Sequence, residues 1–188
     1  KATNNIFRLK QMLKHGSSIG AFISNRDFDS GGDMTTSGID FHYHPGFNIH
    51  VTIHGAVSVH NESNNLEYVP DDEDNQTFDD GRHSKAFDGE EINGSALGIG
   101  ISQWSRTDSR SIVARFRSPG FRTSNGFEQN NNTKWIKVSR GKSIFHENHP
   151  KLLKSDYKFE LTHKENFGGL VKRHEIELEG DYKFNNGI

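Results

Sequence analysis

The sequence predicts an all-β protein, an antiparallel β-sandwich of jelly-roll or lectin-like character with one short N-terminal helix. Apolar and polar residues alternate over many short stretches, and clusters of Gly, Asn, Asp and Ser separate these stretches. Leu, Ile, Val and Phe make up only about 23% of the chain, which predicts a thin core rich in Phe. Many short strands joined by polar turns are typical of sandwiches rather than of βαβ units.

The N-terminal helix is predicted over residues 4–14. Ile6, Leu9 and Leu13 recur at helical spacing, and Gly16 can end the helix. No later stretch of the chain shows this period as clearly.

The strands follow from alternation between turn clusters. The clearest hairpin joins the apolar residues of 97–101 to those of 112–116 through the polar loop 105–109. We expect residues 1–16 to form the helical segment and residues 17–188 a single β-sandwich domain. Strands are predicted at 19–23, 38–43, 47–54, 56–60, 65–69, 96–104, 111–117, 134–139, 157–163 and 174–184.

A ribbon of histidines lies in the first half of the chain. Five of the eleven histidines have even numbers within nineteen residues, and most of the odd positions between them are apolar. Because side chains on a strand alternate faces, this pattern predicts an extended ribbon with one apolar face and one imidazole-lined face. The five are His42, His44, His50, His54 and His60.

Three of these histidines are the candidate metal ligands. His42 and His44 are two residues apart on one strand, about 6.6 Å between Cα atoms. Pro45-Gly46 predicts a turn that returns His50 beside them. The set could hold a divalent metal. The alternative is no cofactor, with the imidazoles forming the polar face of a half-exposed strand.

The run from His42 partly resembles the first metal motif of the cupins. The matching pattern is His42-x-His44-x3-Asn48-x6-Gly55, and Asn48 stands where that family has a Glu ligand. The resemblance covers fourteen residues and implies a metal held by His42 and His44.

A C-terminal strand carries alternate carboxylates. Glu175, Glu177 and Glu179 share one face, and this run resembles the Glu-x-Asp-x-Glu strand of laminarinase-type glycoside hydrolases, with Glu177 in place of Asp. The resemblance implies Glu175 and Glu179 as nucleophile and acid. The same run faintly resembles the last strand of galectins, a match too short to assign ligand residues. The alternative is an acidic edge that blunts a strand.

Aromatic and basic residues form a third set. Residues 103–142 carry a net charge of about +7, whereas residues 61–92 carry about −9. Sugar rings stack on indoles, and Arg holds carboxylates and sulfates. The alternative is that both Trp side chains pack in the core and the bases lie in solvent. The predicted ligand-binding residues are Trp104, Arg115, Arg117, Arg122 and Trp135.

The acidic stretch 70–91 is predicted as a long loop. Its carboxylates at 71–74 and 79–80 could gather calcium, but the spacing lacks the Gly and terminal Glu of an EF-hand, which favours a solvated loop.

Composition removes several classes. A net charge of −2 and a pI of 6.6 exclude a generically basic nucleic-acid binder, and the absence of Cys excludes thiolate chemistry. There is no P-loop, dinucleotide fingerprint, nucleophile elbow or His-Glu-x-x-His helix. No apolar run approaches the length needed to span a membrane, so no membrane partner is expected. Four Asn-x-Ser/Thr acceptors favour an extracellular location.

These observations favour a carbohydrate-binding, lectin-like module for acidic or sulfated glycans. Two alternatives remain open. One is a polysaccharide-degrading enzyme, either a glycosidase using Glu175 and Glu179 or a lyase using His42 or His44 as base. The other is a structural capsid or coat protein that assembles as a homo-oligomer.

Overall fold

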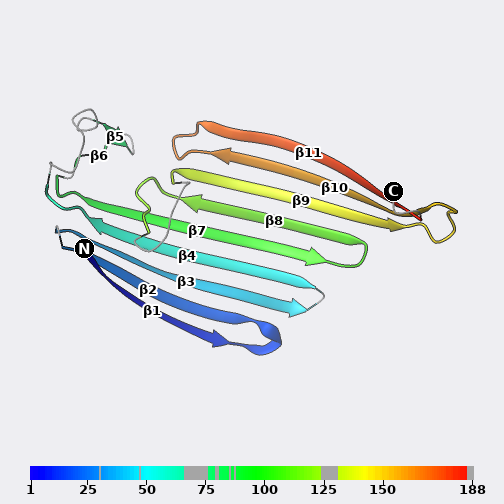
Figure 1. Ribbon diagram of the computed structural model, residues 1–188, viewed down its shortest axis with the longest axis horizontal. Coiled ribbons are helices and arrows are strands. Elements are labelled where there is room, and N and C mark those ends of the chain that lie inside the picture. Colours follow the sequence, from blue (N-terminus) through cyan, green and yellow to red (C-terminus); the bar gives the residue numbers. More distant parts are fainter. Residues whose placement is uncertain are drawn as a thin grey trace.

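The computed structural model describes residues 1–29, 31–46, 48–65, 76–78, 81–84, 86, 88–123 and 131–185. Most of them belong to one nine-stranded sheet, in which every neighbouring pair is antiparallel (Figure 1). The strands follow one another in chain order. They are β1 (Ala2–Met12), β2 (Ser18–Phe28), β3 (Asp33–Gly46), β4 (Ile49–Asn61), β7 (Glu91–Trp104), β8 (Asp108–Arg117), β9 (Thr133–Phe145), β10 (Leu152–Glu165) and β11 (Val171–Phe184).

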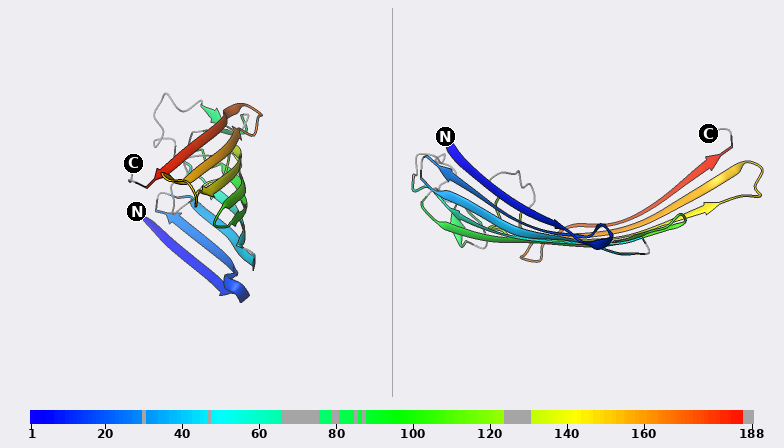
Figure 2. Two further views of the ribbon diagram at one scale, coloured as in Figure 1. Left: turned by 90° about the vertical axis from the view of Figure 1, so that its right-hand side faces the viewer. Right: turned by 90° about the horizontal axis from the view of Figure 1, so that it is seen from below.

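The sheet is a single curved layer. Figure 2 shows it edge-on, with the ends of the two edge strands β1 and β11 bending toward the same side. Its strands are 10 to 14 residues long, about twice the usual length in globular proteins. Two short strands, β5 (Thr77–Phe78) and β6 (His83–Ser84), pair with each other in the connection between β4 and β7.

Alternation explains why these residues form strands. The predicted hairpin is confirmed, because Leu97 pairs with Phe116 and Ile101 with Ile112. The predicted strands 47–54 and 56–60 are continuous as β4, and Pro45-Gly46 lies at the turn that precedes it. The predicted strand 65–69 lies almost wholly outside the described residues.

The all-β prediction is confirmed, but the N-terminal helix is wrong. Residues Ala2–Met12 form strand β1, paired in unbroken register with β2, from Ala2 opposite Phe28 to Met12 opposite Ser18. The one helical turn nearby is a 3-10 segment, Lys14–Gly16, in the connection to β2. Pairing with β2 supplies backbone hydrogen-bond partners along the whole segment. This pairing outweighs the weak helical periodicity of its apolar residues.

Two packed sheets were expected, whereas the described residues form one nine-stranded sheet and the separate two-stranded pair of β5 and β6. The two faces of the nine-stranded sheet are therefore not covered by a second large sheet within the described part of the chain. The buried hydrophobic residues among those described are only Met34, Ala86, Ile92 and Phe121. Most of the buried side chains are polar, such as Ser58, Ser155 and Thr36. The fold is thus held by backbone pairing far more than by an apolar core.

Candidate functional site

One face of the sheet carries a continuous band of apolar side chains, which we call the apolar band. Cross-strand pairing aligns alternate residues of all nine strands on this face. The band consists of Phe7, Leu9, Ile19, Ala21, Ile23, Ile39, Phe41, Tyr43, Ile49, Val51, Ile53, Val57, Val59, Leu97, Ile99, Ile101, Ile112, Ala114, Phe116, Ile136, Val138, Tyr157, Phe159, Leu161, Ile176, Leu178 and Tyr182.

The apolar band is largely open to its surroundings. Ile39 is 61% exposed, Ile101 50% and Leu178 77%. Most soluble monomers keep their apolar patches to a few hundred Å². A band that crosses nine strands therefore needs a cover that the described residues do not supply.

The band also runs obliquely to the strands. On β2 it ends at Ile23, whose register row crosses the sheet to Ser95 on β7. On β11 it runs from Ile176 to Tyr182, several rows toward the opposite end of the sheet. Charged pairs border it, such as Lys134 with Glu165 at 3.4 Å. A boundary that shifts steadily from strand to strand is expected where tilted strands cross a flat apolar layer.

The opposite face, which we call the polar face, carries charged and imidazole side chains. One register row runs Asp40, His54, Gly98, Arg115 and Trp135, from β3 to β9. The Arg115 guanidinium lies 5.1 Å from the centre of the Trp135 ring. This row contains two of the five predicted ligand-binding residues, and Arg117 lies two residues farther along the same face of β8.

The remaining predicted binding residues lie elsewhere. Trp104 ends β7 and packs against His50, with ring centres 4.7 Å apart. Along the neighbouring strand its row is six residues from that of Trp135, about 20 Å. The structure therefore joins Arg115 to Trp135 and separates Trp104 from both.

The predicted metal ligands are partly brought together. The rings of His44 and His50 are 4.3 Å apart across the β3–β4 hairpin. His42 lies instead toward His54, with ring centres 6.3 Å apart. Within the described ranges, no group of three or more His, Cys, Asp or Glu side chains is arranged to hold a metal ion.

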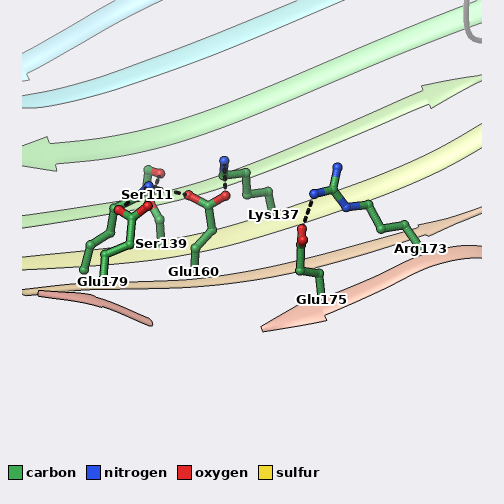
Figure 3. Close-up of polar contacts among 8 residues, drawn as sticks. Ser111, Lys137, Ser139, Glu160, Arg173, Glu175 and Glu179 are labelled. Carbon is green, nitrogen blue, oxygen red and sulfur yellow. Dashed lines mark hydrogen bonds and ion pairs between the residues drawn. The ribbon is translucent and has the colours of Figure 1, made fainter. Parts of the chain in front are cut away.

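The carboxylates of β11 lie on an edge strand and form ion pairs. Figure 3 shows Arg173 beside Glu175, and Lys137 beside Glu160 on the adjoining strands. Lys158 contacts Glu179 at 3.1 Å. Glu175 and Glu179 are four residues apart on one strand, roughly 13 Å, which exceeds the separation that a retaining glycosidase needs.

Residues 118–123 fold back over the polar face after β8. The Arg122 amide donates to Ser58 Oγ at 3.1 Å, and Thr36 Oγ1 donates to the Arg122 carbonyl at 3.4 Å. Gly94 permits this contact, because a Cβ there would lie 2.2 Å from the Phe121 backbone. The predicted binding residue Arg122 is thus held by its backbone in a strap across the sheet.

An acidic cluster lies beside this strap, beyond the end of β4. His83 Nδ1 lies 3.1 Å from Glu90, and the Glu62 amide donates to the Glu90 carbonyl at 2.9 Å. Burial, with the nearby Glu90 and Asp88 carboxylates, raises the pKa of Glu62 to about 7. Arg122 opposes this shift but does not cancel it. The calcium candidates at 71–74 and 79–80 lie outside the described residues.

No family model, curated protein or solved structure matches the chain. The described residues include no helix with the length and hydropathy needed to cross a membrane.

Sequence reasoning did not predict that the apolar band would be exposed. The signal was present as alternation in every strand, together with a low total of apolar residues. Alternation shows that a strand has two faces, but not what covers the apolar one. Sequence reasoning also did not place Phe22 and Asp40 on the polar face. Their position follows from the register in which β2 pairs with β3 and β3 with β4.

Proposed function

We propose that this sheet is part of the wall of a membrane-embedded assembly. Its apolar band contacts lipid chains. Its polar face lines a water-filled space that polar solutes pass through or in which they bind. The carrying observation is the exposed apolar band on one side of a single layer whose other side is charged. This proposal departs from the expectation of no membrane partner, which rested on the absence of a long apolar run.

Three features favour lipid as the cover. A strand that crosses a bilayer needs about 9–11 residues, and these strands reach that length. The oblique course of the band fits tilted strands that cross a flat apolar layer. Within the band, outward apolar and inward polar residues alternate, as in membrane-spanning strands, and charged outward residues such as Lys134 and Arg140 on β9 lie beyond it.

The test compares two adjacent positions of β7. Ile101 lies in the apolar band and Ser102 on the polar face. A Lys on a lipid-facing position costs roughly 2–4 kcal/mol near the bilayer centre, and one on the water-lined face costs little. We expect Ile101→Lys to reduce insertion of the full chain into phosphatidylcholine vesicles at least tenfold and Ser102→Lys to leave it unchanged, measured by flotation and protease protection.

Two results would contradict this proposal. One is equal insertion of both variants. The other is a wild-type chain that stays in the aqueous phase as a discrete oligomer, which would assign the band to contacts between copies and favour the structural-protein alternative.

A second candidate function is glycan binding by the polar face, favoured by the Arg115 guanidinium that lies 5.1 Å from the centre of the Trp135 ring. Stacked aromatic rings and guanidinium groups suit acidic sugars. The double variant Arg115→Ala with Arg117→Ala is expected to lose retention on an anionic polysaccharide while keeping its far-UV circular dichroism. Unchanged retention would exclude this function. The hydrolase alternative receives no support from the spacing of Glu175 and Glu179.

A further inference from the structure

A hollow of about 410 Å³ is lined by residues of the five adjacent strands β2, β3, β4, β7 and β8, together with Phe121. This volume is in the usual range for sites that hold small molecules. The side chains that reach it from the polar face and from the 118–123 strap are Phe22, Asp40, His54, Arg115, Arg117 and Phe121.

Two glycines lie under rings that line this hollow: Gly98 is itself part of the lining, and Gly38 lies just beside it. A Cβ at Gly98 would lie 2.5 Å from His54 Cδ2, and one at Gly38 would lie 2.6 Å from Phe22 Cε1. Each ring therefore lies close over bare backbone, which leaves the space above it open. Glycines inside strands commonly mark such close approach.

The charges in the hollow are unevenly compensated. Asp40 Oδ1 is paired with Arg8 at 3.1 Å, whereas its Oδ2 is buried without a hydrogen-bond partner and lies 3.9 Å from the His42 ring. The Arg115 guanidinium lies over the Trp135 ring, and among the described residues it forms no ion pair with a carboxylate. A guanidinium over a ring still has N–H donors for other partners, and their fork fits a carboxylate.

We propose that this hollow binds a small organic carboxylate that carries a ring. Arg115 holds the carboxylate, and the ring lies between Phe22 and Phe121. This inference rests on the part of the proposed function in which the polar face is open to water. The aromatic walls favour an organic anion over an inorganic one, because an inorganic anion gains nothing from them.

The experiment uses the full chain in vesicles, with Trp104→Phe as background so that Trp135 is the remaining tryptophan. Sodium glucuronate is the probe, glucose the neutral control and sodium sulfate the inorganic one. We expect a saturable change in Trp135 fluorescence with glucuronate alone. Arg115→Gln should weaken glucuronate binding at least tenfold, confirmed by calorimetry. Arg110→Gln, on the other face of β8, should not.

Other results would overturn the site. These are no saturable response to glucuronate, an equal response to glucose or sulfate, or equal binding by the Arg115 and Arg110 variants. Vesicle flotation of the same samples separates the two proposals. Protein that inserts without binding overturns the carboxylate site alone, whereas protein that binds glucuronate without inserting overturns the lipid contact alone.

Discussion

At the scale of single residues, the polar face depends on two glycines whose missing side chains leave room for neighbouring rings. Gly98 and Gly38 carry no side chain, and His54 and Phe22 occupy the space that a Cβ would fill. The sequence alone could not predict this packing. A glycine inside a strand normally only weakens the strand, and its role in close packing is visible only when its cross-strand partner is known.

Glu62 gives a prediction at this scale. Its raised pKa means that the folded state binds its proton more tightly than the unfolded chain, whose Glu titrates near 4.5. The contribution to stability is therefore complete below about pH 4.5 and is lost as pH rises to about 7. We expect the Arg122 amide, bonded to Ser58, to lose protection from hydrogen exchange between pH 5 and 7.5 after correction for intrinsic rates.

Glu62→Gln is the matched variant for that measurement. It keeps the shape of the side chain and removes the titration, so its protection should change less with pH. The nearby His83 and Glu90 side chains, 3.1 Å apart, are present in both proteins, so the two differ only in the Glu62 carboxyl. A wild-type profile identical to that of the variant would contradict the assignment.

At the scale of elements, the 118–123 strap is the feature that the strand pattern did not predict. It follows a strand whose existence and pairing were predicted, but its course depends on the small residue at Gly94 and the hydroxyls of Thr36 and Ser58. These residues come from three different strands, so no local pattern could place them together.

Gly94→Val tests the position of the strap. The added side chain would meet the Phe121 backbone, which must then move off the sheet. We expect faster trypsin cleavage after Arg122, with far-UV circular dichroism unchanged because the strands remain paired. Gly46→Val is the control, because a Cβ there meets nothing within 4 Å, although its positive φ adds local strain at a distant turn. Equal cleavage of the Gly94 variant and the wild type would show that the strap does not depend on Gly94.

At the scale of the whole molecule, the sequence predicted an all-β chain, but the described residues do not show the second large sheet of a sandwich. Alternation placed the hairpin of β7 and β8 and the face of Arg115 correctly. The sandwich was inferred because an apolar face must be covered, and a second sheet is the usual cover in soluble proteins. The same alternation is equally compatible with lipid as the cover. The helix over residues 4–14 failed for a different reason, since β2 offered the segment a full set of backbone partners.

The long connection between β4 and β7 has a consequence for the order of folding. Most neighbouring strands are joined by short turns, such as residues 105–107 between β7 and β8, but β4 and β7 are separated by residues 62–90. Closing a loop about ten times longer costs roughly 2 kcal/mol more in chain entropy. The hairpins within β1–β4 and within β7–β11 can therefore form first. The pairing of β4 with β7, which joins the two halves of the sheet, is then the slow step of folding.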